Sequence, residues 1–238
     1  MNDQYKKLSS YYDAFVQKNR DYKAIARSLV DIIGNSKTLL EIGIGTGLIA
    51  EQLMQIDPSY RITGIDNSDS LLALAKEKVG GSVDLHYQSI SKLNLDKTFD
   101  VAYSRGGAWT FAHDSKEPLL VSHILDFEEI RQSFHCVANH LKPGGLLAIS
   151  FTNAYGDTVI ELDDGIVHKR IAKTEKVDDA FHAVFTYIFC REDMVLAQQD
   201  LRLRLLDWQQ VKSLLMEAGF AEISSDQNEF CVYVKQGT

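Results

Sequence analysis

The stretch from residue 38 to residue 47 constrains the fold of this chain more than any other. A short apolar run with strand character ends in three glycines at every second position, Gly43, Gly45 and Gly47, and Leu48–Ile56 continues with helical spacing. Such glycines allow a sharp turn and the close approach of a ligand, while the first turn of the following helix offers free N–H groups. The stretch therefore predicts a strand, a tight turn and a helix beside a nucleotide-like ligand.

The details of this turn favour a ligand without phosphates. The spacing is G-x-G-x-G, not the G-x-G-x-x-G of dinucleotide folds, and Glu41 would repel a nearby pyrophosphate. A second strand, Tyr60–Ile65, is followed by Asp66, which lies 19 residues beyond Gly47. A carboxylate at that place can accept both hydroxyls of a ribose.

These residues resemble the cofactor site of the class I S-adenosylmethionine (SAM)-dependent methyltransferases. The resemblance rests on Glu41 and the three glycines, on Gly64–Asp66, and on the later turn at Lys142–Gly145. It implies that the glycine turn passes under the methionine part of SAM and that Asp66 holds the ribose. The alternative is a dinucleotide-binding or merely glycine-rich α/β turn, and Asp66 together with the later turn argues against it.

The resemblance also implies further cofactor contacts. Asn67 stands where the family places a residue against the adenine, and Ser89 stands where it often has an Asp that bonds the adenine amine. This departure puts the adenine contacts in doubt, although Ser89 or Gln88 could still hydrogen-bond the base. We also assign Ile90 and Ser104 to the cofactor site.

The first 33 residues predict two helices that precede the first strand, because apolar and aromatic residues recur at helical spacing with a break near residues 19–21. Residues 11–13 and 19–22 resemble the front of small-molecule N-methyltransferases, among them the amino-sugar N,N-dimethyltransferases. The resemblance implies a lid over the cofactor, with Tyr12 facing the reacting methyl group and Tyr22 the methionine end. Plain core packing is the alternative for both, and we assign Tyr5 to the core.

The segment 105–114 follows a predicted strand at Phe99–Ser104, where open α/β sheets place their ligands. We read it as a loop that lines the methyl-acceptor site. Arg105 could pair with a carboxylate of the substrate or of SAM, and the alternative is a surface ion pair. Trp109 and Phe111 could line the acceptor site and attract a sulfonium or an ammonium through their ring faces. The alternative is plain packing. His113 is the candidate general base by location, and a solvated loop histidine is equally consistent with the pattern.

The rest of the chain fits one domain over residues 1–238 with an insertion. Residues 152–206 alternate in strand-like runs separated by acidic turns, which predicts a small antiparallel sheet. By resemblance, this sheet roofs the acceptor site or forms a homodimer contact. A final helix after Asp207 and two closing strands complete a Rossmann-like, doubly wound α/β fold. We expect a mostly parallel seven-stranded sheet with an antiparallel terminal hairpin.

Composition restricts the partners. With 33 acidic and 25 basic residues, the net charge of −8 opposes strong binding to nucleic acid. No stretch has the length of uncharged apolar residues that a membrane span needs, and the start lacks a signal-peptide core. The three cysteines have neither disulfide nor metal spacing. We expect a cytoplasmic protein with reduced thiols and no metal.

The predicted function is methyl transfer from SAM to a small molecule, with nitrogen preferred over oxygen. Methyl transfer is an in-line displacement, so the protein mainly aligns donor and acceptor and excludes water. His113 and Tyr12 are the candidate catalytic residues. The alternatives are a different reaction of SAM, such as cyclisation, and a SAM-binding protein without turnover.

Overall fold

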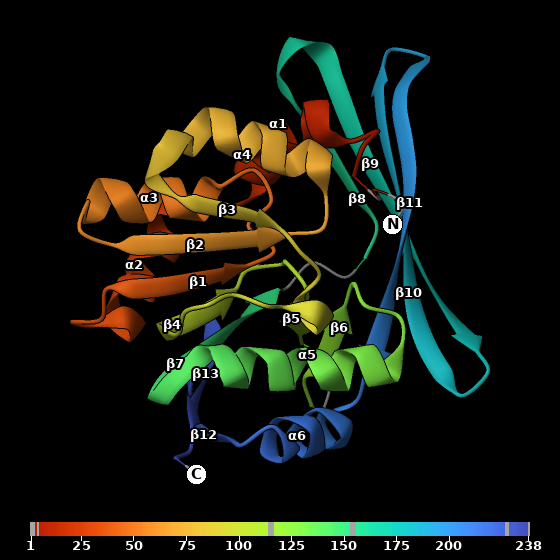
Figure 1. Ribbon diagram of the computed structural model, residues 1–238. Helices are drawn as coiled ribbons and strands as arrows, with labels where there is room; N and C mark the ends of the chain where they lie inside the picture. The colour runs from red at the N-terminus through yellow and green to blue at the C-terminus, as the bar shows by residue number, and fades with distance from the viewer. Residues whose placement is uncertain (1–2, 4, 114–116, 153–155, 227–228, 238) are drawn as a thin grey trace.

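The computed structural model describes residues 3, 5–113, 117–152, 156–226 and 229–237 (Figure 1). Its central sheet runs in the order β3, β2, β1, β4, β7, β13 and β12. β1, β2, β3, β4 and β7 are parallel, whereas β13 is antiparallel to β7 and to β12. The bounds are β1 Thr38–Ile42, β2 Arg61–Asp66, β3 Asp84–Tyr87, β4 Phe99–Ser104, β7 Leu141–Thr152, β12 Phe220–Asp226 and β13 Phe230–Lys235. The expected seven-stranded sheet with its terminal hairpin is confirmed within these residues.

Helices cover both faces of this sheet (Figure 1). The bounds are α1 Ser9–Asn19, α2 Tyr22–Ile33, α3 Leu48–Ile56, α4 Asp69–Val79, α5 Phe127–His140 and α6 Trp208–Glu217. Alternate residues of one strand pack into two separate hydrophobic cores, one on each face of the sheet. Leu39 of β1 packs with residues of α2 and α3, whereas its neighbour Leu40 packs with residues of α5 and α6. Strands buried on both faces are what an almost wholly apolar strand sequence predicts.

Polar side chains fix where the helices begin. Ser68 caps α4 by accepting a hydrogen bond from the backbone N–H of Leu71, and Asp126 caps α5. Asp207 forms a capping box with Gln210 at the start of α6. Because these caps satisfy N–H groups that the first helical turn leaves unpaired, the sequence marks these helix starts clearly. No helix in the described part of the chain is long and apolar enough to cross a bilayer.

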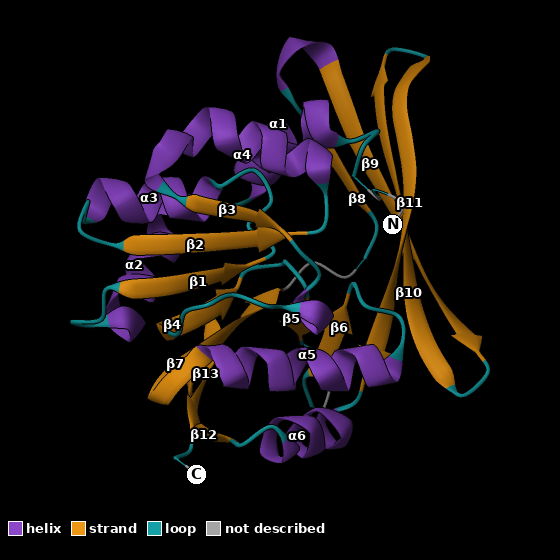
Figure 2. Cartoon of the chain, viewed as in Figure 1, coloured by secondary structure: helices purple, strands orange, loops and turns teal. Residues whose placement is uncertain are grey.

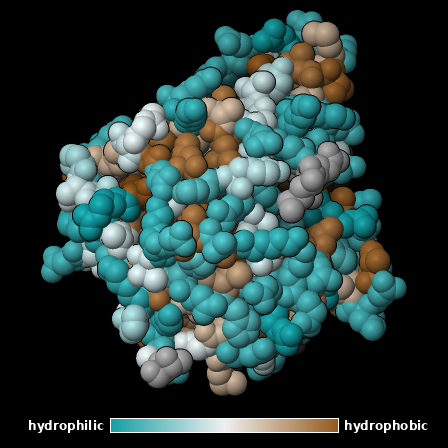
Figure 3. Space-filling view, viewed as in Figure 1, coloured by the Kyte–Doolittle hydropathy of each residue, from teal (hydrophilic) through white to brown (hydrophobic). Residues whose placement is uncertain are grey.

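A second, antiparallel set of strands extends the central sheet from β7 (Figure 2). Its strands are β5 Trp109–Ala112, β6 Leu119–Ser122, β8 Thr158–Glu161, β9 Ile166–Val177, β10 Ala180–Arg191 and β11 Met194–Leu206. β8 to β11 match the expected inserted strands. The space-filling view in Figure 3 shows a largely hydrophilic face, with apolar side chains gathered near the upper end of this inserted sheet.

The segment after β4 differs from the expected loop. β5 pairs in parallel with β7, where Phe111 lies opposite Phe151, and antiparallel with β6. β6 in turn pairs with β11, so β5 and β6 join the inserted strands to the central sheet. The aromatic residues in this segment are therefore strand residues, and only residues 105–108 connect β4 to β5.

Candidate cofactor and acceptor site

The glycine turn after β1 has the backbone that only glycine adopts easily. Gly43 has a φ of +70° and Gly45 a φ of +56°. A Cβ atom at Gly43 would lie 2.5 Å from the Cα atom of Gly107, so the two chain segments touch backbone to backbone. A Cβ atom at Gly45 would meet no atom within 4 Å. Gly47, also at positive φ, is the N-cap of α3.

Asp66 connects the end of β2 to this turn. Its Oδ2 atom accepts a hydrogen bond of 2.8 Å from the backbone N–H of Gly45, and its Oδ1 atom accepts one of 2.9 Å from the N–H of Ser68. Burial raises the pKa of the Asp66 carboxyl, and these backbone bonds oppose that rise. The backbone N–H of Asn67 also favours the charged form. Since a carboxylate offers about four acceptor positions, Asp66 keeps capacity for a ligand hydroxyl.

A cavity of about 340 Å³ opens beside these residues. We call it the cofactor cavity. Its lining includes five residues expected at the cofactor site: Gly43, Asp66, Asn67, Ser89 and Ile90. The carboxylate of Asp66, the glycine backbone and the Ser89 hydroxyl fit an adenosyl ligand, which carries ribose hydroxyls and a base edge but no phosphate.

Five other expected cofactor residues do not line this cavity, among them Gly45 and Gly47 of the turn itself. Glu41 is buried and accepts a 3.0 Å hydrogen bond from the Tyr103 hydroxyl. Burial raises the pKa of Glu41 to about 8, so the carboxyl is largely protonated at neutral pH. The buried Ser104 hydroxyl donates to the Trp109 carbonyl at 2.8 Å. Tyr22 is the first residue of α2 and packs against the core.

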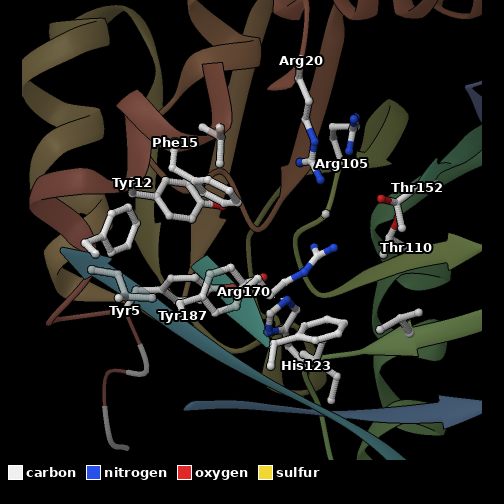
Figure 4. A pocket seen from close by; sticks show the side chains of 17 residues that line it. Tyr5, Tyr12, Phe15, Arg20, Arg105, Thr110, His123, Thr152, Arg170 and Tyr187 are labelled. Carbon is white, nitrogen blue, oxygen red and sulfur yellow. Dashed lines mark hydrogen bonds between the residues drawn. The ribbon is translucent and has the colours of Figure 1, made fainter. Parts of the chain in front are cut away.

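A second cavity of about 100 Å³ lies between α1 and the inserted strands, and we call it the acceptor cavity. Figure 4 shows its two sides: Tyr5, Tyr12, Phe15 and Tyr187 form an aromatic side, and the guanidinium groups of Arg20, Arg105 and Arg170 lie opposite. Tyr12 and Arg105, both expected at the acceptor site, line this cavity. Burial raises the pKa of the Tyr12 phenol, which keeps it protonated at neutral pH.

Tyr5 and His123 line both cavities. The Tyr5 hydroxyl lies 3.4 Å from Nε2 of His123, and burial lowers the pKa of His123 to about 4. The imidazole is therefore neutral at pH 7. Sequence reasoning assigned Tyr5 to the core and passed over His123. Neither residue carries a local signal, because the pairing of β6 with β5 and β11 is what brings His123 to the site.

The other aromatic candidates lie elsewhere. Trp109 and Phe111 are 0% exposed, and Trp109 stacks on Phe134 of α5 at 4.4 Å between ring centroids. They fill the core because β5 is a strand of the sheet, and neither lines the acceptor cavity. His113 is exposed at the end of β5, where it stacks on Phe151, and it lines neither cavity.

Hydrogen bonds and an ion pair fix the N-terminal segment beside the cofactor cavity. Asp13 of α1 forms a 2.6 Å ion pair with Lys78 of α4 and accepts a hydrogen bond from the Thr46 hydroxyl in the glycine turn. Asp3 accepts a 2.8 Å hydrogen bond from Ser68, next to Asp66. These contacts hold Tyr5 between the two cavities and Tyr12 at the acceptor cavity.

Sequence comparisons relate the chain to known methyltransferases. The family model described as a methyltransferase domain matches residues 39–145. A malonyl-[acyl-carrier protein] O-methyltransferase of Bacillus anthracis is 31% identical over 135 residues, 54% of this chain and 44% of the relative. A second enzyme of that name, from Ilyobacter polytropus, is 27% identical over 170 residues, 68% of this chain and 59% of the relative. The chain thus spans about half the length of these curated relatives.

Solved structures resemble the chain over nearly its full length. Streptomyces venezuelae DesVI has a TM-score of 0.72 at 17% identity, covering 97% of this chain and 98% of that one. SAM-bound CalS10, an amino pentose methyltransferase from Micromonospora echinaspora, has a TM-score of 0.71 at 17% identity, covering 95% and 97%. At this identity the likeness shows the fold, including the inserted strands.

Proposed function

We propose that this chain, whose residues 39–145 form a SAM-dependent methyltransferase domain, transfers a methyl group from SAM to a small-molecule acceptor, with nitrogen preferred over oxygen. The observation that carries the proposal is the contact between the two cavities. Tyr5 and His123 line both, so a cofactor in one and an acceptor in the other would meet at these two side chains. Such an arrangement favours direct transfer between bound groups, because aligning the reacting atoms supplies much of the catalysis.

Different residues would bind the cofactor and the acceptor. Asp66 and the glycine turn would hold the adenosyl part of SAM, with Asn67 and Ser89 toward the base. Bound SAM supplies an electrophilic methyl group on a positively charged sulfur. The tyrosines of the acceptor cavity exclude water and present ring faces that favour positive charge. α1 closes this arrangement through the contacts of Asp13 with Thr46 and Lys78.

The preference for nitrogen rests on the weakness of the available base. His123 is neutral, and its lowered pKa makes it a poor proton acceptor but a suitable hydrogen-bond acceptor for an amine N–H. The Tyr12 phenol stays protonated. A neutral amine already carries the attacking lone pair and needs only orientation, whereas an alcohol would need a stronger base. His123, with Tyr5, is therefore our candidate for orienting the acceptor.

A carboxylate oxygen is a second candidate acceptor, because an ionised carboxylate also attacks without a base. The arginines of the acceptor cavity favour it, and it agrees with the name O-methyltransferase of the malonyl-[acyl-carrier protein] relatives. The likeness to the sugar N-methyltransferase KedS8 over 95% of this chain, which includes the inserted strands that line the acceptor cavity, favours nitrogen.

The test is a product analysis with SAM and a panel of acceptors that carry an amine, a hydroxyl or a carboxylate. We expect S-adenosylhomocysteine and a methylated amine, and Asp66→Asn should lose most of the turnover. Methylthioadenosine as the product would indicate cyclisation of SAM. Binding of SAM without turnover of any acceptor would indicate a binding protein, and either result would overturn the proposal.

A further inference from the structure

We propose that the acceptor carries a carboxylate group, which the guanidinium groups of Arg20 and Arg105 bind. The inference rests on the proposed function, because it concerns the molecule in the acceptor cavity. It names the chemical class of that molecule: a small acid whose charged end lies against the arginines and whose methyl-accepting atom lies toward His123.

Arg105 is the first observation. Its Nε and Nη1 atoms are buried, and neither has a hydrogen-bond partner among the described residues. Leaving buried guanidinium donors without a partner costs free energy, and a bound anion removes that cost. Arg105 follows β4 directly, at the end of a central strand, so the sheet fixes its backbone within the cavity wall.

Arg20 is the second observation. It lines the acceptor cavity together with Arg105, and like-charge repulsion from Arg20 adds to burial in lowering the pKa of Arg105 to about 10. Neither arginine forms an ion pair with any described carboxylate. The chain has 33 acidic and 25 basic residues, so the lack of an ion pair between these arginines and a described carboxylate is notable. Two adjacent guanidinium groups match the geometry of a carboxylate, which accepts paired N–H bonds.

The neighbouring charged groups leave these two arginines available. Arg170 is engaged, because its Nε and Nη2 atoms donate to the Gly156 carbonyl at 3.0 and 2.6 Å. Asp21 accepts the capping bond from the N–H of Ala24. Glu229 lines an adjoining cavity of about 420 Å³ and attracts Arg105 without forming an ion pair with it. That adjoining cavity, which Arg20 and Arg105 also line, gives room for the rest of an acid.

The methionine part of SAM also carries a carboxylate, so the source of the anion has to be distinguished. The charges in the two cavities favour the acceptor. Asp66 and Glu129 line the cofactor cavity, and neither Arg20 nor Arg105 is among its lining residues. A positively charged sulfonium suits the acidic cavity, and an acid suits the basic one.

The test uses malonate as a probe, titrated into full-length protein saturated with S-adenosylhomocysteine and followed by calorimetry. We expect malonate to bind and its uncharged diamide not to bind. Arg105→Met and Arg20→Met should each weaken malonate at least about tenfold, the scale of a lost charge-assisted hydrogen bond, and Arg105→Lys should weaken it less. Arg191→Met, at the exposed end of β10, is the matched control and should bind malonate normally.

The variants also separate the two sources of the anion. S-adenosylhomocysteine should bind the arginine variants as tightly as it binds the wild type. A loss of its affinity in Arg105→Met would assign the arginines to the cofactor and overturn the inference. Unchanged malonate binding in both variants would also overturn the inference. A preference of the wild type for inorganic phosphate over malonate would overturn it too. If the wild type bound no S-adenosylhomocysteine at all, the proposed function itself would fail, which is a separate outcome.

Discussion

The Tyr5 hydroxyl lies 3.4 Å from Nε2 of His123, and both side chains line the cofactor cavity and the acceptor cavity. Tyr5 comes from the N-terminal segment and His123 from the residue after β6, so the contact joins the lid to the extended sheet. In the tautomer with the ring proton on Nε2, the ring donates to the Tyr5 hydroxyl oxygen and Nδ1 can accept a hydrogen bond. This pair lies where donor and acceptor would meet.

Replacing His123 tests this placement. We expect His123→Ala to lower kcat by roughly 10²-fold, the scale on which a small misplacement of a reacting group slows the reaction. Tyr5→Phe, which keeps the ring and removes the hydroxyl, should lower it less. Steady-state kinetics with the best acceptor measure both effects. The control is His113→Ala, because His113 is exposed and outside both cavities. A larger loss in His113→Ala than in His123→Ala would contradict this assignment.

The lid contacts of Asp13 should matter for cofactor affinity. Asp13→Asn removes the charge that pairs with Lys78, while the amide keeps much of the shape. Because this pair is partly buried, we expect SAM to bind several-fold more weakly and α1 to be cleaved faster in limited proteolysis. Lys18→Gln is the control, since the Lys18–Asp163 pair is largely exposed. Equal behaviour of the two variants would show that the Asp13 contacts do not hold the lid.

Glu41 should oppose folding as the pH rises. Its pKa is about 8 in the folded protein and 4.5 ordinarily, so between these values the unfolded chain releases a proton that the folded chain retains. Stability is therefore lost as the pH rises from about 4.5 to about 8. Glu41→Gln keeps a hydrogen-bond acceptor for Tyr103 and cannot titrate. The free energy of unfolding of the variant, relative to that of the wild type, should therefore rise by up to roughly 1.4 kcal/mol per pH unit in this window. Urea unfolding at several pH values measures the difference, and parallel curves would refute the raised pKa.

His168 should act in the opposite sense. It is 0% exposed, neither ring nitrogen has a described partner, and its ring lies 3.9 Å from that of Phe15. Burial, together with Arg170, lowers its pKa from 6.5 to about 4. As the pH falls from about 6.5 to about 4, the unfolded chain binds a proton that the folded chain does not, so stability is lost. His168→Met should flatten this decline. The unfolding curves of variant and wild type would then converge at low pH, and a constant offset between them would contradict the prediction.

The cofactor half of the protein could be predicted from sequence because its signals are local. Gly43, Gly45 and Gly47 stand in one turn, and the strand that ends at Asp66 is read directly from its apolar residues. Capping residues such as Asp207 marked helix starts in the same way. The mostly parallel seven-stranded sheet with its terminal hairpin followed from the family resemblance and agrees with the structure.

The acceptor half depends on pairings between distant residues, which no local pattern reports. Phe111 lies opposite Phe151, 40 positions later in the chain, and this pairing turns an expected aromatic loop into a core strand. The same change brings His123 to the site and leaves His113 outside it. Arg105 could be predicted to lie near the site because it directly follows a central strand, and in the structure it lines the acceptor cavity.

Calorimetric titration of SAM and S-adenosylhomocysteine tests the central claim most directly. The proteins are the wild type, Asp66→Asn, and the control Asp84→Asn, which changes a carboxylate of β3 that lines the cavity at the other end of the strands. Both ligands should bind the wild type and the control. Asp66→Asn should weaken both by roughly 1–3 kcal/mol, the scale of a lost hydrogen bond to a charged group. Failure of both ligands to bind the wild type, or tighter binding of NAD, would contradict the account.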